Sequence, residues 1–218
     1  MLLRKKLPPI REPRLYLSME RSYLSLIKFV IVAFGAGILA RKFAIALPFF
    51  HMERLLPFFL ALYRILTIPA VLVLIAIIPL FWWDLRYVAQ GPSVSAQEMR
   101  DPRVYFSAER TFLAWIRTAL SSIAFAFVLA KFDFILRKFS IVFHVHIPLL
   151  QRLAGSNSLF LAFGLALMIL GFWGLFGTHA SIRQGVCLLP YGRYGSAALV
   201  LLLLSLGMIR LLWVIGWN

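Results

Sequence analysis

Residues 100–132 read RDPRVYFSAERTFLAWIRTALSSIAFAFVLAKF, and residues 11–43 read REPRLYLSMERSYLSLIKFVIVAFGAGILARKF. The two stretches align without a gap at an offset of 89 residues, and they share polar as well as apolar positions. So many polar identities at one register indicate an internal duplication. Each copy starts with charged residues and continues into an apolar segment of membrane-spanning length. The duplicated stretch therefore sets the expected architecture.

The composition is that of a polytopic membrane protein. Of the 218 residues, 62% are hydrophobic, and the net charge is +15. The mean hydropathy of +0.88 lies far outside the usual range of soluble domains. We predict an all-α membrane helix bundle with five spans, at about residues 23–43, 65–83, 111–132, 158–177 and 196–215.

The duplication divides the chain into two unequal units. Residues 1–90 form a first, degenerate repeat with two spans and interfacial segments, and residues 91–218 form a second, complete repeat with three spans. Because two spans return the chain to its starting side, both repeats enter the membrane in the same direction and are parallel. The connections at residues 44–64 and 133–153 mix aromatic and charged residues, so we expect them to lie in the membrane interface.

The distribution of Lys and Arg favours one orientation. The segments that share a side with the N-terminus hold more basic residues than those on the other side. Cytoplasmic loops are enriched in Lys and Arg, so we expect an inner (plasma) membrane protein with a cytoplasmic N-terminus and an outside C-terminus.

A basic residue recurs at heptad positions in both copies of the repeat. Seven residues make nearly two turns of an α-helix and rise roughly 10.5 Å, so residues with this spacing stay on one stripe. Hydrocarbon excludes charge, so a cationic stripe on an apolar helix requires a cause. The basic residues are Arg14, Arg21, Lys28 and Lys42 in the first copy, and Arg103, Arg110, Arg117 and Lys131 in the second.

Two explanations of the stripe remain open from the sequence. The long side chains of Lys42 and Lys131 are most simply explained by snorkelling to the membrane surface. For Lys28 and Arg117, pairing that fixes helix packing and lining of a polar path are both consistent with the pattern. The candidate anion-binding or pore-lining residues are therefore Arg110, Arg117, Lys131, Arg21, Lys28 and Lys42.

Two glutamates accompany the stripe. Glu20 and Glu109 each directly precede an arginine of the stripe, at equivalent positions of the two copies. Glu109 has no ideally spaced basic partner on its own helix. We therefore expect these carboxylates to form salt bridges with another helix or subunit.

Other functional classes have little support. Cys187 is the only cysteine, which excludes an internal disulfide and a multi-cysteine metal site. No acid–base, nucleophile, haem or metal arrangement is recognisable, so we predict no enzyme, no metal site and no cofactor. No motif indicates nucleic-acid binding. The excess of cations favours anionic lipid headgroups or another polyanion as partners.

The motif ERTFLAWIRT, residues 109–118, resembles the signature of the YidH-like family, catalogued as domain of unknown function 202. That family's three-helix unit is similar to the small membrane subunit of the vacuolar transporter chaperone complex. The resemblance implies subunits assembled around an axis, with Arg110 and Arg117 facing phosphate or polyphosphate and Glu109 pairing between subunits. Their counterparts in the first copy are Arg21, Lys28 and Glu20.

Two functional hypotheses follow. In the first, a non-enzymatic membrane protein assembles as a homo-oligomer, or with other subunits, around a basic path that binds or conducts an anion. In the second, the chain is an accessory or scaffold subunit of a larger membrane complex, and its charges bind lipid headgroups and partner subunits.

Overall fold

The computed structural model describes residues 12–89, 94–142, 156–185 and 190–216, and all regular structure in these ranges is helical. The predicted all-α class is therefore confirmed for the part of the chain that is described. Two short 3-10 helices, η2 (Leu47–Phe50) and η3 (Glu53–Leu55), join the first two long helices. The α-helices are α1 (Pro13–Ala46), α2 (Leu56–Ala89), α3 (Ala96–Met99), α4 (Pro102–Val142), α6 (Ser156–Gln184) and α7 (Pro190–Gly216).

The two copies of the repeat start their helices in the same way. Pro13 and Pro102 occupy the first position of α1 and α4, where proline's missing N–H costs nothing. The side chain of Asp101 accepts a hydrogen bond from the backbone N–H of Arg103 at 2.8 Å, which caps α4. Both helices then continue without a break for 34 and 41 residues, or roughly 50 and 60 Å.

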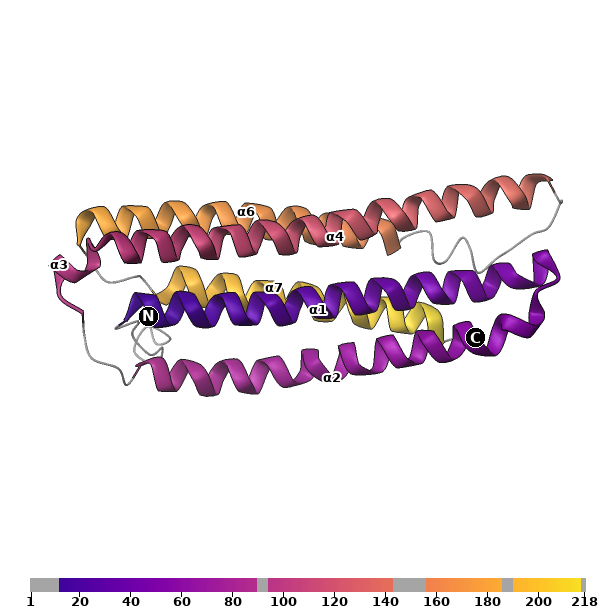
Figure 1. Cartoon of the computed structure of the whole chain (residues 1–218), viewed down its shortest axis with the longest axis horizontal. Helices are drawn as coiled ribbons and strands as arrows, with labels where there is room; N and C mark the ends of the chain where they lie inside the picture. Colours follow the sequence, from indigo (N-terminus) through magenta and orange to yellow (C-terminus); the bar gives the residue numbers. More distant parts are fainter. Residues whose placement is uncertain (1–11, 90–93, 143–155, 186–189, 217–218) are drawn as a thin grey trace.

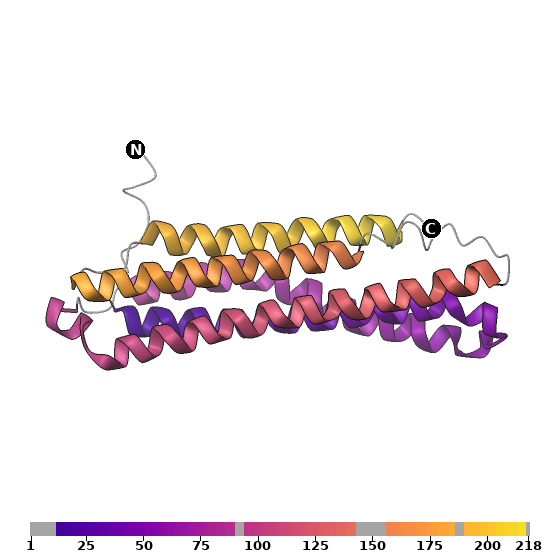
Figure 2. The same cartoon turned by 90° about the horizontal axis from the view of Figure 1, so that it is seen from above.

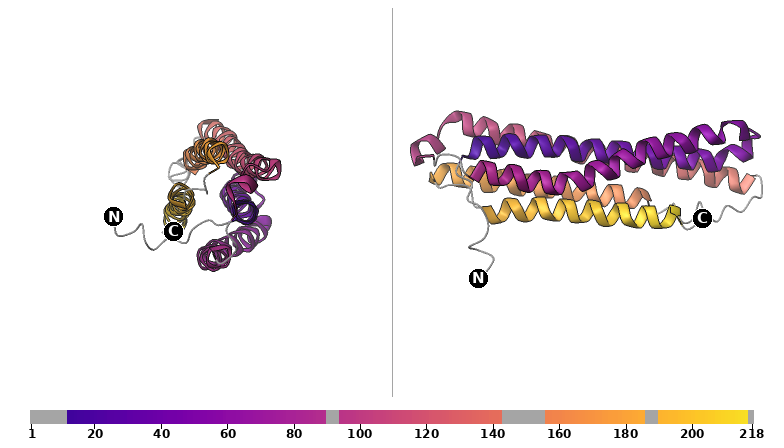
Figure 3. Two further views of the ribbon diagram at one scale, coloured as in Figure 1. Left: turned by 90° about the vertical axis from the view of Figure 1, so that its left-hand side faces the viewer. Right: turned by 90° about the horizontal axis from the view of Figure 1, so that it is seen from below.

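The long helices lie side by side in an elongated bundle (Figure 1). α1, α4 and α7 run in one direction, and α2 and α6 run in the other (Figures 1 and 2). The view along the bundle shows α1 between α2 and α4, with α6 against α4 (Figure 3). α1 and α4 are therefore parallel, as the duplication predicts.

Equivalent residues of the two copies contact each other where α1 and η2 lie beside α4. The rings of Phe43 and Phe132 have centroids 4.5 Å apart, and those of Phe50 and Phe139 are 5.2 Å apart. Each pair is separated by the repeat offset of 89 residues. Contacts between equivalent positions arise when two parallel units are related by an axis along the bundle, the arrangement of parallel repeats in membrane proteins.

The helical hairpins of the two copies also pack alike. Tyr23 of α1 meets Phe81 of α2 edge to face, with centroids 5.1 Å apart. Its counterpart on α4, Phe112, meets Phe172 of α6 in the same geometry at 4.9 Å. The α1–α2 and α4–α6 hairpins thus have equivalent directions, and each holds an edge-to-face ring pair at the same position of its first helix. The division of the chain into domains at residues 90 and 91 remains a prediction.

The predicted spans all fall within helices, but their number is confirmed only in part. α1, α2, α4 and α6 are each long and apolar enough to cross a membrane. In α7 the apolar stretch that the structure describes is shorter, Leu199–Arg210, so a fifth span remains a prediction.

The segments predicted to lie in the membrane interface continue the long helices where they are described. Residues 56–64 are the first turns of α2, and residues 133–142 continue α4. Phe50 and Phe139 contact each other, but Phe58, Phe134 and Ile141 are exposed, so an interfacial position of these segments remains a prediction. Residues 143–153 lie outside the described ranges.

The connection between α2 and α4 is short, because α2 continues to Ala89 and α4 begins at Pro102. Its later part contains the short helix α3. Ser95 and Glu98 cap the N-terminus of this helix with reciprocal hydrogen bonds, a capping box. Hydrogen bonds from the Ser95 backbone and side chain hold the pKa of Glu98 below its usual value.

Glycines on α6 show where this helix lies closest to α4. A Cβ on Gly164 would lie 2.6 Å from Ile123 Cγ1 and 2.9 Å from the Ala119 carbonyl oxygen of α4. A Cβ on Gly174 would meet no atom within 4 Å. The glycines of α6 therefore lie in a close helix contact in its first part and on open surface further along.

We predict that Gly164→Leu separates α6 from α4, whereas Gly174→Leu does not. The first change forces a side chain against backbone atoms of α4, and overpacking of this kind typically costs about 1–3 kcal/mol. Thermal unfolding of the purified protein in detergent should show a lower midpoint for Gly164→Leu only. Equal midpoints for the two variants would contradict the observed α4–α6 packing.

Candidate functional site

The basic stripe of α4 lies on one exposed face of its helix. Arg103, Arg110, Arg117 and Lys131 are all exposed, as is Ala124 at the heptad position between the last two. α4 buries other heptad positions, including Ala108, Trp115 and Leu129, against α1 and α6. The stripe therefore points away from the interior of the chain, and its shared direction is as predicted.

The burial of the α1 stripe increases along the helix. Arg21 and Lys28 are half-buried, whereas Gly35 and Lys42 are fully enclosed. A Cβ on Gly35 would lie only 2.7 Å from Phe125 Cδ1 of α4. Gly35 is thus a close-packing position and leaves no open axis inside the chain.

Lys28 and Arg117 line the same groove between α1 and α4. These two residues are equivalent positions of the repeat. The groove has a volume of about 380 Å³ and is completed by Ser25, Phe29, Val32, Ala114 and Thr118. The structure therefore brings together the two candidates that the sequence placed 89 residues apart.

Among the residues that the structure describes, no carboxylate lines this groove or forms a salt bridge with its cations. Among the described residues, the salt bridges are Arg14–Asp101 and Lys42–Asp133. Glu20 is buried between the helices, where its Oε1 accepts a hydrogen bond from Trp115 Nε1 at 2.7 Å. Glu20 thus binds an indole N–H of the second copy, and its predicted salt bridge remains a prediction. Glu109 is half-buried and forms no ion pair there either.

Threonine hydroxyls on α4 fix the register of the two helices beside the groove. The hydroxyl of Thr111 lies 3.2 Å from the Leu17 carbonyl oxygen, and that of Thr118 lies 3.4 Å from the Leu24 carbonyl oxygen. Each hydroxyl also donates to a carbonyl of its own helix, so its proton is shared. The contacts repeat every heptad on both helices, which holds Lys28 beside Arg117.

The charged residues of α2 indicate how deep the groove lies in the membrane. Arg64 and Asp84 are separated by 20 residues without a charge between them, or roughly 30 Å of helix, the thickness of the hydrocarbon core. The hydroxyl of Tyr23 donates to Asp84 Oδ2 at 2.6 Å, which places this part of α1 at one edge of that layer. Lys28 lies five residues further along α1, or roughly 7.5 Å deeper. A flexible lysine spans this distance, so the groove is within reach of water and headgroups.

Lys42 does not snorkel, contrary to the prediction. Its side chain is completely buried, and its Nζ donates a hydrogen bond to Asp133 Oδ1 of α4 at 2.5 Å. The partner satisfies the charge inside the protein, so the side chain has no need to reach water. Lys131, its repeat equivalent, is exposed as snorkelling requires.

Asp133 is the important residue that sequence reasoning missed. It is buried, and its Oδ2 has no hydrogen-bond partner among the described atoms. The available signal was a lone acidic residue within the apolar segment FDFILRKF. A carboxylate in such a segment indicates a buried cationic partner. The equivalent position of the first copy is Ala44, so the repeat comparison did not reveal the pair.

A comparison with protein-family models finds one match. Residues 103–186, which contain all of α4 except its first residue and the whole of α6, match the model described as Domain of unknown function (DUF202). This confirms the family resemblance for that part of the second repeat. No curated protein and no solved structure matches the chain. The similarity to the chaperone-complex subunit remains a prediction.

We predict that Lys42 and Asp133 stabilise the protein only as a pair. Removing one partner by Lys42→Met or Asp133→Leu leaves a buried charge and should cost about 3–5 kcal/mol. The double variant should recover most of this loss, because an apolar pair of similar volume is often neutral or stabilising. Thermal unfolding of all four proteins in detergent measures the coupling. Additive losses in the double variant would show that the two side chains do not stabilise each other.

Proposed function

We propose that this chain, in which residues 103–186 form a DUF202 domain, is a non-enzymatic membrane protein that binds an anion in the groove lined by Lys28 and Arg117. Phosphate or polyphosphate is the ligand class that best fits two adjacent cations. The proposal further holds that chains assemble with each other, or with other membrane subunits, around these grooves.

The observation that carries the proposal is the uncompensated charge of the groove. Lys28 and Arg117 come from different helices, line one groove of about 380 Å³, and have no described carboxylate beside them. Two cations at the edge of hydrocarbon repel each other and lose hydration. An anion that accepts hydrogen bonds from both offsets these costs, and phosphate oxygens suit the arginine fork.

Assembly is supported by the direction in which the stripe faces. Arg110, Arg117 and Lys131 lie on the outer face of α4, and Gly35 closes the space between α1 and α4. A continuous basic path is therefore one that neighbouring chains or subunits complete. Exposed Leu113, Leu120 and Phe127 beside the stripe supply apolar surface for such contacts.

A second candidate function is that of an accessory or scaffold subunit. The position of the groove near the edge of the hydrocarbon layer favours it, because lipid phosphates are found at this depth. In this case the same two cations bind an anionic headgroup, and the stripe of α4 contacts a partner complex. Both proposals include an inner-membrane location with a cytoplasmic N-terminus and an outside C-terminus.

We predict that Lys28→Gln and Arg117→Gln each weaken polyphosphate binding by about tenfold or more. Hydrogen bonds to charged groups contribute about 1.5–3 kcal/mol, and 1.4 kcal/mol corresponds to a factor of ten. Binding of a short polyphosphate to the purified full chain, measured by calorimetry at two salt concentrations, tests this. The affinity should also fall with increasing salt, because the groove is exposed to solvent ions.

Arg64→Gln is the matched control, since Arg64 is exposed on α2 near the opposite edge of the apolar layer. Unchanged affinity in both groove variants would contradict the anion site. Anion flux from liposomes separates the two functions. Flux that the groove substitutions abolish supports a path, whereas purification with one large partner complex and no flux supports scaffolding.

A further inference from the structure

A second cavity lies on the other side of α1, between α1, α6 and α7. Its volume is about 380 Å³, and every lining residue except one is apolar or glycine. α1 contributes Val30, Ile31 and Phe34, which lie between Lys28 and Lys42 in the middle of its apolar stretch. The cavity is therefore at membrane depth, where its surroundings are hydrocarbon.

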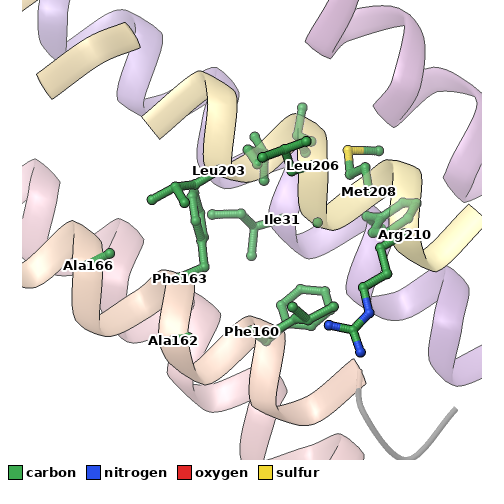
Figure 4. Close-up of a pocket in the computed structure, with 14 residues that line it drawn as sticks. Ile31, Phe160, Ala162, Phe163, Ala166, Leu203, Leu206, Met208 and Arg210 are labelled. Carbon is green, nitrogen blue, oxygen red and sulfur yellow. The ribbon is translucent and has the colours of Figure 1, made fainter. Parts of the chain in front are cut away.

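The one charged residue of the lining is Arg210 of α7. Figure 4 shows its side chain reaching toward Phe160, near the end of the bundle where α6 begins. Phe160 is four residues into α6, roughly 6 Å from the start of that helix. No Asp or Glu of the described chain lies within salt-bridge distance of Arg210. The cavity thus has an apolar body and an unpaired cation at one end.

We propose that this cavity binds an acyl chain of a phospholipid whose anionic headgroup lies beside Arg210. The apolar lining matches a hydrocarbon tail, and the guanidinium matches a phosphate in charge and hydrogen-bonding geometry. Cavities of about 300–1,000 Å³ are of the size that holds small-molecule ligands. The site is separate from the Lys28–Arg117 groove and does not depend on the proposed function.

The charge of the lining favours a lipid over a helix of another subunit as the occupant. An anionic headgroup supplies the counter-charge that Arg210 lacks among the described residues. Lipid is also the apolar solvent that surrounds the bundle. A lipid that fills this space also joins α7 to α1 and α6, whose residues line it together.

The test uses the full chain reconstituted in nanodiscs with equal amounts of phosphatidylglycerol and phosphatidylcholine. After extraction and washing in detergent, native mass spectrometry identifies the retained lipid. We expect retained phosphatidylglycerol in the unsubstituted protein. Gly207→Leu should remove it, since a Cβ on Gly207 meets no atom within 4 Å and the larger side chain fills the cavity. Gly174→Leu, on open surface of α6, is the control and should retain the lipid.

Arg210→Gln tests the headgroup separately. It should reduce the preference for phosphatidylglycerol over phosphatidylcholine by about fivefold, the effect of one cation near an anionic lipid surface. Arg64→Gln on α2 is the matched control and should leave the preference unchanged. Retained lipid that neither cavity variant alters would overturn the proposal. A change of oligomeric mass in Gly207→Leu without loss of lipid would overturn it as well, since it would identify a neighbouring chain as the occupant.

Discussion

The structure depends on how α1 satisfies the polar groups that it carries into an apolar environment. Its buried carboxylate, Glu20, accepts a hydrogen bond from Trp115 of α4, and its buried ammonium, Lys42, donates to Asp133 of the same helix. Near one edge of the apolar layer, its Tyr23 donates to Asp84 of α2. Each of these groups would cost several kcal/mol if left unpaired in hydrocarbon. α1 is therefore stable in the centre of the bundle because its neighbours carry complementary groups at matching heights.

Pairing with a carboxylate distinguishes cations that stabilise the fold from cations that are available to bind a ligand. Lys42 is neutralised inside the protein, so it is part of the fold. Lys28 and Arg117 have no such partner among the described residues, although they belong to the same heptad series. The contrast between Lys28 and Lys42 supports a ligand for the first and a packing role for the second. A heptad pattern alone does not make this distinction, since both lysines occupy the same stripe.

Much of the fold was predictable from periodicity and internal comparison. The offset of 89 residues predicted that α1 and α4 run in parallel. The heptad spacing predicted that the basic residues of α4 share one face of that helix. These features are local, or they follow from the duplication, so they require no knowledge of which helices are neighbours.

The contacts of particular side chains were less predictable. Gly35 occupies a heptad position, but only the position of Phe125 on α4 shows that it is closed. The depth of Lys42 suggested snorkelling, because its partner Asp133 has no equivalent in the first copy. The segments predicted to be interfacial continue α2 and α4 as helices, which their aromatic residues alone did not indicate.

The pairing of Lys42 with Asp133 also bears on how this chain arose from its duplication. The reverse pair does not exist, since the residue that would face Lys131 is Ala44, and the counterpart of Trp115 is Leu26. Complementarity across the pseudo-twofold axis is therefore one-sided, as in a heterodimer whose subunits have become fused. By the same geometry, two copies of the first half would place Lys42 against Ala44 without a counter-charge, whereas two copies of the second half would place Lys131 against Asp133. The first half therefore depends on the second for its counter-charge, and the fusion supplies that partner in a fixed ratio at synthesis.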